Sequence, residues 1–209
     1  MAGSIPRATV ARLPLYLLCL EGMSQAIVSS DQLASTAGVN SAKVRKDLSY
    51  LSPKGTRGVG YDVKELKQLI ALKLGRMASS VVAIVGAGNL GQALAGFEGF
   101  SEHGFTVAAL FDTDPAKVGN TVGGTRIYHL DELGSVVAGE AITIGMITTP
   151  EGPAQEVADK LAAAGVRSIL NFAPAILKVP EGVEVRRVDL STELQILSYY
   201  LNIEKDAAG

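Results

Sequence analysis

Apolar residues near the N-terminus recur at intervals of three and four residues, which is the spacing of one face of a helix. The positions are Val10, Leu13, Leu17 and Leu20. Pro14 lies inside this run, and a proline in a helix interior removes a hydrogen bond. The first segment is therefore predicted to form a helix that is bent or begins late.

Two further helices are predicted on either side of a tight turn. The segment SSDQLASTA has Ser29 or Ser30 as its N-cap and ends before Gly38, and the next helix begins at Ser41. This second helix of the pair is rich in Lys and Arg. Such an arrangement is typical of a helix-turn-helix that reads double-stranded DNA.

The helix from Ser41 has two different faces when its residues are placed at ~100° intervals. Val44, Leu48 and Leu51 share one side and are expected to pack against Leu33 and the first helix. Small and cationic side chains lie opposite them: Ala42, Arg45, Lys46 and Ser49. Small residues permit a close approach to a groove, and the cations supply donors for guanine edges or phosphates. An ordinary solvated face is the alternative.

A glycine-rich segment, PKGTRGVGYDV, follows this helix. Its three glycines bracket Arg57 and suit a hairpin that presents an arginine at its tip, like the wing of a winged helix. A phosphate-binding loop is disfavoured because no GK[ST] ending follows. Asp62 then caps a helix that ends this part of the chain near residue 78. The predicted DNA-contacting residues are Ser41, Ala42, Lys43, Arg45, Lys46, Ser49, Tyr50, Lys54 and Arg57.

From about residue 79 the pattern changes to buried strands that alternate with helices. VVAIV, TVAALFD, RIYHL, AITIGMITTP, RSILNFAP and VEVRRVDL are the predicted strand segments. Strands that alternate with helices favour a parallel sheet covered on both faces. The predicted fold class is therefore α/β, with a winged helix-turn-helix domain followed by a doubly wound, mostly parallel Rossmann domain.

The first of these strands runs into GAGNLG, which satisfies the dinucleotide motif GxGxxG. Gly86 permits the tight turn, Gly88 lets the backbone approach a pyrophosphate, and Gly91 allows close helix packing. Asp112 ends the next strand, where it can bind both ribose hydroxyls and repel a 2′-phosphate, so NAD(H) is favoured over NADP(H). Asp114 is expected to cap a short helix over DPAKVG. The predicted cofactor residues are Gly86, Ala87, Gly88, Asn89, Leu90, Gly91, Asp112, Thr148, Thr149, Pro150, Asn171, Phe172, Ala173 and Pro174.

Charge divides the chain in the same place. Residues 1–76 hold eleven Lys and Arg against five Asp and Glu, whereas residues 77–209 hold eight against sixteen. A basic part joined to an acidic one indicates different partners, with the basic part facing a polyanion. The single cysteine excludes an intrachain disulfide framework. No membrane span or cleavable leader is recognised, so a cytoplasmic protein without a metal site is expected.

Catalysis is disfavoured. The only histidines are His103 and His129; the first precedes a strand, at the wrong edge of the sheet, and the second has no obvious partner. No catalytic residue is assigned, and no substrate domain is evident. Two alternatives from other classes remain: an NAD-dependent oxidoreductase, and a CoA-binding domain similar to those of acyl-CoA ligases, against which Asp112 counts.

The last segment, DLSTELQILSYYLNIEK, is predicted to be an amphipathic helix. Leu194, Leu197, Tyr200 and Leu201 form its apolar stripe. The stripe can be buried on the helix's own sheet or on a second subunit. Because helix-turn-helix proteins bind palindromes as dimers, a homodimer is favoured.

Taken together, these segments resemble the Rex family of redox-sensing transcriptional repressors. RLPLYL, AGVNSAKVRKDLSYL, GTRGVGYDV, GAGNLGQALA, ILNFAP and VPEGVEVRRVDLS look like Rex segments in the same order. The resemblance implies a winged-helix domain at 1–78, a Rossmann NAD(H)-binding domain at 79–189 and a dimerisation helix at 190–209 that is swapped between subunits. It also implies that NADH releases the repressor from a pseudo-palindromic operator, with Arg45, Lys46 and Arg57 on the DNA.

Two positions depart from the family pattern. Rex proteins tend to carry an arginine at Leu18 and a tyrosine at Phe97, and both join an aspartate that matches Asp189 in a polar switch network. Here only Asp189 has the expected type. The alternative within the family is therefore a repressor with altered or lost NADH switching.

Overall fold

The chain divides into two compact units, Met1–Ala78 and Ser79–Gly209. The structure, a computed structural model, describes residues 5–53, 55–56, 60–75 and 79–208. Each unit has its own hydrophobic core, as the sequence patterns predict.

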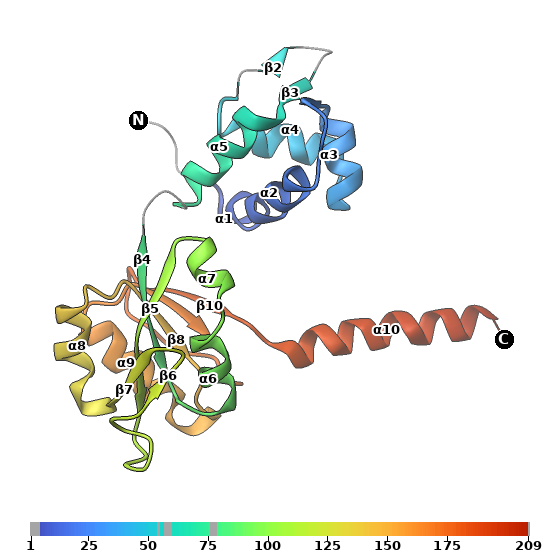
Figure 1. Ribbon diagram of the computed structural model, residues 1–209. Coiled ribbons are helices and arrows are strands. Elements are labelled where there is room, and N and C mark those ends of the chain that lie inside the picture. The colour runs from blue at the N-terminus through green and yellow to red at the C-terminus, as the bar shows by residue number, and fades with distance from the viewer. Residues whose placement is uncertain (1–4, 54, 57–59, 76–78, 209) are drawn as a thin grey trace. The chain divides into compact units, whose positions relative to one another are not determined.

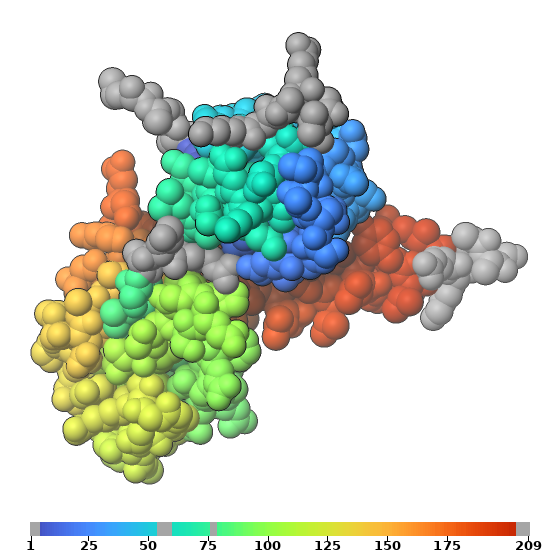
Figure 2. All heavy atoms as spheres, turned by 45° about the horizontal axis from the view of Figure 1, so that its top comes forward, coloured from blue at the N-terminus to red at the C-terminus, as the bar shows by residue number. Residues whose placement is uncertain are grey.

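The first unit is a winged helix built from short elements. Its helices are α1 (Arg7–Val10), α2 (Leu13–Glu21), α3 (Ser30–Ala37), α4 (Ser41–Ser49) and α5 (Val63–Lys73). Its strands β1 (Ile27–Val28), β2 (Gly55–Thr56) and β3 (Gly60–Asp62) form an antiparallel sheet in the order β1-β3-β2. Figure 2 shows this unit as closely packed spheres, coloured from blue to turquoise.

The predicted bend in the first helix is a complete break. α1 ends at Val10 and α2 begins at Leu13, so Pro14 lies in the first turn of α2. Backbone N–H groups in the first turn have no partner within the helix, so a proline there removes no hydrogen bond. Leu13, Leu17 and Leu20 are buried, whereas Val10 is exposed. The apolar face predicted for this segment therefore belongs to α2 alone.

The helix-turn-helix has the predicted boundaries. The Ser29 hydroxyl accepts a hydrogen bond from the Gln32 amide at 3.1 Å, and the Gln32 side chain accepts one from the Ser29 amide at 2.8 Å, which completes a capping box. Gly38 ends α3 with φ of +64°, a left-handed conformation that favours glycine. The Asn40 side chain then caps α4 by accepting from the Ala42 amide at 2.7 Å.

The second unit is a seven-stranded Rossmann sheet. Its strands are β4 (Ser80–Val85), β5 (Phe105–Asp112), β6 (Thr121–Val122), β7 (Thr125–His129), β8 (Ile144–Ile147), β9 (Ser168–Asn171) and β10 (Glu184–Arg187). Their order is β10-β9-β8-β4-β5-β7-β6, and every neighbouring pair is parallel except β6 with β7. The predicted mostly parallel α/β fold is confirmed.

Helices cover both faces of this sheet, with α6 (Asn89–Ala95) and α7 (Gly99–Glu102) on one side and α8 (Leu133–Gly139) and α9 (Glu151–Ala163) on the other (Figure 1). Alternate residues of β4 point to opposite faces. Val82 and Ile84 belong to the core under α6 and α7, and Ala83 and Val85 to the core under α8 and α9. Burial on both faces explains why VVAIV is a continuous apolar run.

One predicted element is wrong. The segment DPAKVG is a hydrogen-bonded turn, in which the Asp114 carbonyl accepts from the amides of Lys117 and Val118 at 3.0 and 3.2 Å. Gly119, with φ of +88°, ends the turn before a helix can form. After a short 3-10 turn η1 (Leu130–Glu132) and the strands above, the chain closes with the long helix α10 (Leu190–Ala208). Among the described residues, no helix is long and apolar enough to cross a membrane.

Candidate nucleic-acid interface and cofactor crevice

The outer face of α4 is the candidate DNA interface. Ala42, Lys43, Arg45, Lys46 and Ser49 are all exposed, and Ser41 is half-buried at the start of the helix. Arg45 lies 3.8 Å from the Asp31 carboxylate, but both side chains are mostly solvent-exposed, so the pair holds Arg45 only weakly. The opposite face, with Val44, Leu48 and Leu51, is buried as predicted.

The hairpin after α4 is present as far as the structure describes it. Gly55 pairs with Tyr61, and Thr56 pairs with Gly60. Tyr50, exposed at the C-cap of α4, lies just before this hairpin. The predicted contacts Lys54 and Arg57 fall outside the described residues, so their role stays a prediction.

A buried carboxylate on α4 escaped the sequence prediction. Asp47 accepts hydrogen bonds from the Thr9 hydroxyl at 2.8 Å and the Tyr16 hydroxyl at 2.7 Å. The Arg12 guanidinium donates two more, at 2.6 and 2.7 Å. The side chain of Asp47 is only 2% exposed. Three groups from α1, α2 and the residues between them thus converge on α4, the candidate DNA-contacting helix, and fix its orientation.

This cluster shifts the pKa values of its members. Burial would raise the pKa of Asp47, but the hydrogen bonds from Arg12, Tyr16 and Thr9 outweigh it, so its pKa lies below the usual value. Burial first, and then the Asp47 carboxylate, raise the pKa of Tyr16 to about 12. The cluster is therefore held together by a carboxylate that stays ionised and a phenol that stays neutral.

The carboxyl ends of the central strands meet at one edge of the Rossmann sheet. Val85 of β4 pairs with Phe111 on one side and Ile147 on the other, and Ile147 pairs with Asn171. The residues that follow these positions therefore line one crevice, at the point where the strand order reverses around β4. Dinucleotides bind at such a switch point in open α/β sheets.

The glycine motif leaves the crevice open. A Cβ at Gly91 would lie 2.0 Å from the Gly86 carbonyl oxygen, so this position requires glycine. Gly86 has φ of +107°, and its Cβ would meet the Thr148 backbone at 2.9 Å. Gly88, in contrast, has no described atom within 4 Å of its Cβ position. The space beside Gly88, at the start of α6, is therefore free for a ligand group.

Two threonines follow β8 at the same edge of the sheet. The Thr148 hydroxyl donates to the Gly86 carbonyl at 2.8 Å, which braces the glycine turn. The Thr149 hydroxyl is buried and has no hydrogen-bond partner among the described residues. An unpaired buried hydroxyl costs free energy, and a bound ligand would supply its partner. Pro150, exposed, is the N-cap of α9.

Asp112 closes the other side of the crevice. Its carboxylate accepts hydrogen bonds from the Ala87 amide at 2.8 Å, the Asp114 amide at 2.9 Å and the Lys117 ammonium at 3.1 Å. Burial acts to raise the pKa of Asp112, but these bonds lower it below the usual value. The carboxylate is therefore ionised and joined directly to the glycine loop, as recognition of a ribose requires.

The loop after β9 is held by its own asparagine. The Asn171 side chain is buried; it accepts from the Ala173 amide and donates to the Ala175 carbonyl, both at 2.9 Å. Its amide is thus used within the loop. Phe172 is half-buried, Ala173 is buried and Pro174 is exposed. A contact between this loop and a cofactor stays a prediction, and the Asn171 side-chain amide is already used within the loop.

Asp189, Leu18 and Phe97 are the three positions that the family resemblance connects with switching. Asp189 immediately precedes α10 and accepts from the Thr192 hydroxyl, the amides of Ser191 and Thr192, and Arg187. The Thr192 hydroxyl is the largest cause of its lowered pKa. Leu18 is 66% exposed and Phe97 56% exposed, and Phe97 stacks edge-on against Phe100 with ring centroids 5.0 Å apart.

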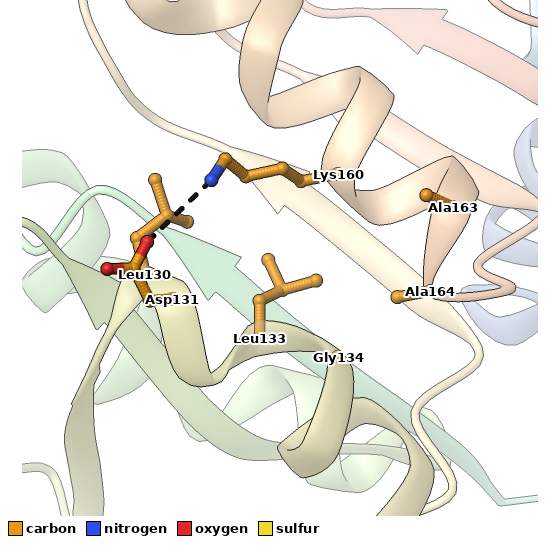
Figure 3. Close-up of a pocket in the computed structure, with 7 residues that line it drawn as sticks. All are labelled: Leu130, Asp131, Leu133, Gly134, Lys160, Ala163 and Ala164. Atoms are coloured by element: carbon orange, nitrogen blue, oxygen red, sulfur yellow. Dashed lines mark ion pairs between the residues drawn. The ribbon is translucent and has the colours of Figure 1, made fainter.

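Neither histidine forms a buried catalytic pair. His103 Nδ1 contacts the Gly99 carbonyl at 2.7 Å on the surface. His129 Nδ1 accepts a hydrogen bond from the Asp131 amide at 3.3 Å and lies 3.3 Å from the Asp131 carboxylate, which is largely exposed, so its neighbours are surface groups. Asp131 also pairs with Lys160 at 3.8 Å in a hollow of about 330 Å³ between η1, α8 and α9 (Figure 3). Within the described residues, no group of three or more His, Cys, Asp or Glu is arranged to hold a metal.

Comparison with known proteins places both units. Residues 4–49 match a family described as a putative DNA-binding protein N-terminus, and residues 78–175 match the CoA binding domain family. The redox-sensing transcriptional repressor Rex of Streptomyces griseus subsp. griseus is 58% identical over 94% of this chain and 79% of its own. That of Desulfitobacterium hafniense is 46% identical over 93% and 94%.

Solved structures agree with these relatives. RSP, a Rex-family repressor, in complex with β-NAD+ and operator DNA matches with a TM-score of 0.90 and 34% identity, over 97% of this chain and 95% of that one. RSP in complex with β-NADH matches with a TM-score of 0.88, over 97% of both chains. The chain therefore belongs to the Rex family of redox-sensing transcriptional repressors.

Proposed function

We propose that this chain represses transcription by binding an operator through α4 and its wing, and that NADH in the Rossmann crevice weakens this binding. The observation that carries the proposal is the presence of an exposed basic helix and an open dinucleotide crevice in separate compact units of one chain. The family relatives are named redox-sensing repressors, and RSP binds operator DNA with β-NAD+.

On DNA, α4 supplies both kinds of contact that a specific interface needs. Exposed Arg45 and Lys46 carry donors for guanine edges or phosphates, and Ala42 and Ser49 leave room for the groove wall. Asp47, on the opposite side, keeps the helix fixed against α1 and α2. We propose Ser41, Lys43, Tyr50 and Lys54 as contacts to the DNA backbone around this centre, and Arg57 as a contact to a minor groove or a phosphate.

In the crevice, the glycine motif would hold the pyrophosphate and Asp112 the adenosine ribose. The open space at Gly88 and the unpaired Thr149 hydroxyl fit a polar ligand at this edge. The dinucleotide serves here as a ligand whose oxidation state is read, and we propose no catalysis by the chain. The CoA-binding family match covers the same sheet, so NADH and CoA are to be compared directly in binding assays.

The test of this proposal is a paired operator titration. Fluorescence anisotropy with a labelled operator, at one fixed salt concentration because phosphate contacts are salt-dependent, is measured with NAD+ and then with NADH. We expect tight binding with NAD+ and weaker binding with NADH. Equal affinity in both states would sink the redox response alone and would select the alternative raised by Leu18 and Phe97, a repressor that has lost NADH switching. No operator binding in either state would remove the repressor function.

Two variants separate a true operator complex from general attraction to DNA. Arg45→Ala should weaken operator binding by about 1–3 kcal/mol if Arg45 reads a base edge. Lys73→Ala removes an exposed cation from α5, outside α4 and the wing, and should change it by less than ~0.5 kcal/mol. Equal losses in both variants would contradict the role of Arg45.

We also propose that the chain acts as a homodimer through α10. Its large apolar side chains form two stripes on opposite sides of the helix, at 190, 194, 197 and 201 and at 196, 199, 200 and 203, so Tyr200 belongs to the second stripe and not, as predicted, to that of Leu194 and Leu197. All eight are between 45 and 67% exposed. A helix that is apolar on two sides must be covered on both, and one chain alone covers neither.

An apolar groove on the Rossmann sheet is a suitable seat for the α10 of a second copy. It is lined by β4, α7, β5, β8, β9 and β10, and its lining includes the apolar Val82, Phe105, Ile144 and Met146 and the charged Glu184 and Arg186. The groove lies on the face of the sheet that carries α6 and α7. No helix connects β9 to β10 through the described residues 172–183, so this end of the face stays open. Exchange of α10 between two copies would bury both surfaces.

The oligomeric state tests this exchange. Sedimentation equilibrium of the full chain should give twice the 21.7 kDa mass of one copy. Leu194→Glu combined with Leu197→Glu places charges in one stripe and should yield monomers, since unpaired buried charges are costly. Gln195→Glu, between the stripes, is the control and should leave the mass unchanged. A dimer that survives the double change would show that α10 is not the interface.

A further inference from the structure

A lysine stands directly beside the carboxylate that is expected to recognise the ribose. Lys117 Nζ lies 3.1 Å from Asp112 Oδ2 and 3.8 Å from Asp114 Oδ2. The Asp112 side chain is 12% exposed and that of Lys117 34% exposed, so the ammonium covers the carboxylate and still reaches solvent. The crevice at the end of β5 therefore holds two carboxylates and one cation.

The turn after β5 fixes this placement. Asp114 Oδ1 accepts from the Ala116 amide at 2.9 Å, and the Asp114 carbonyl accepts from the amides of Lys117 and Val118. The chain thus turns back on itself within six residues and brings Lys117 under the end of the strand. Because the turn is hydrogen-bonded, the backbone of Lys117 is held close to Asp112. The short distance between the two side chains therefore does not depend on the Lys117 side-chain conformation alone.

The charge balance decides how strongly the site rejects a 2′-phosphate. Two unopposed carboxylates next to the ribose would repel a phosphate dianion, since like charges at close range are unfavourable in a partly buried site. Lys117 cancels one of these charges and is also a cation of the kind that binds phosphate. We propose that Lys117 is a specificity-determining residue, which weakens the discrimination that Asp112 makes between NADH and NADPH. This inference rests on the proposed function of the crevice.

Binding of NADH itself does not need Lys117. An ionised carboxylate has about four acceptor positions, and the amides of Ala87 and Asp114 orient Asp112 without help from the lysine. Removal of the ammonium frees one acceptor position for a ribose hydroxyl. The role of Lys117 is therefore expected to appear in the ratio of two affinities rather than in NADH binding alone.

Fluorescence titrations with NADH and with NADPH test the proposal on the full chain. Lys117→Met should raise the ratio of the NADPH to the NADH dissociation constant by about tenfold, with NADH affinity changed little. Lys160→Met is the matched control, because Lys160 also pairs with two carboxylates, Asp131 and Glu156, but lines the hollow in Figure 3. The control should leave the ratio unchanged. Asp112→Asn should move it in the opposite direction.

Each outcome is decisive. An unchanged or lowered ratio in Lys117→Met overturns the inference, and so does a wild-type protein that binds NADH but shows no measurable affinity for NADPH. In both cases NADH binding stands, and the proposed function is untouched. A wild-type chain that binds neither nucleotide, with its fold verified by circular dichroism, overturns the proposed function and this inference together.

Discussion

Replacement of Asp47 by alanine is expected to lower the free energy of unfolding of the DNA-binding unit by about 3 kcal/mol and to abolish operator binding. The change removes the acceptor of four hydrogen bonds, from Thr9, Arg12 and Tyr16. It leaves the hydroxyl proton of the buried Tyr16 without its acceptor and the Arg12 guanidinium without its counter-charge. Removal of one partner of a buried pair costs more than the pair contributes, because the other partner remains desolvated.

Urea denaturation followed by circular dichroism measures this loss, and the operator titration measures its effect on function. Asp31→Ala is the matched control, since Asp31 is an exposed carboxylate on α3 that forms only a long, 3.8 Å pair with the exposed Arg45 among the described residues. It should change the free energy of unfolding by less than ~0.5 kcal/mol. A loss of similar size in both variants would show that the cluster has no special part in holding α4.

The same cluster sets a pH dependence in the wild-type chain. Because the pKa of Asp47 is lower in the folded state, its contribution is complete above the ordinary aspartate value of ~3.9 and is lost as the pH falls below it. Because the pKa of Tyr16 is raised to about 12, its contribution is complete below the ordinary value of ~10 and is lost as the pH rises toward 12. In a plot of the free energy of unfolding against pH, Asp47→Ala should make the decrease at acid pH less steep.

The faces of α4 could be predicted from periodicity, because burial of Val44, Leu48 and Leu51 needs only the helix repeat. Asp47 could have been found by the same projection, since it lies next to Leu51 on the apolar side. A charged residue on a buried face indicates a partner, and Arg12 is a cation within reach. What the projection alone does not give is which residues of α1 and α2 meet it, because that depends on the break between those helices.

The crevice shows a similar division. The glycine motif and Asp112 follow from the order of strand, loop and helix, which is local in sequence. The contact between Lys117 and Asp112 depends on the turn at DPAKVG, where a helix was predicted and Gly119 takes a left-handed conformation. The Thr148 brace on Gly86 spans 62 residues and arises from the pairing of β4 with β8, which strand order within one sequence does not specify.

Substitution of Gly91 by alanine is expected to abolish NADH binding and to lower the free energy of unfolding of the Rossmann unit by about 3 kcal/mol. The added methyl group would lie 2.0 Å from the Gly86 carbonyl oxygen and 3.0 Å from the Thr148 hydroxyl. Backbone on one side and a braced threonine on the other cannot both move away. The glycine turn must therefore open, and the hydrogen bond from Thr148 to Gly86 is lost with it.

Gly88→Ala separates the ligand from the fold within the same motif. No described atom lies within 4 Å of its Cβ position, and φ of −81° suits alanine, so the free energy of unfolding should fall by less than ~1 kcal/mol, the cost of a poorer N-cap. NADH affinity should nevertheless fall, because the methyl group occupies the space that we propose for the pyrophosphate. Gly134→Ala in α8, also without a neighbour within 4 Å, is the control and should leave NADH binding unchanged. If Gly88→Ala binds NADH as tightly as the wild type in fluorescence titration, the dinucleotide does not lie along the glycine motif.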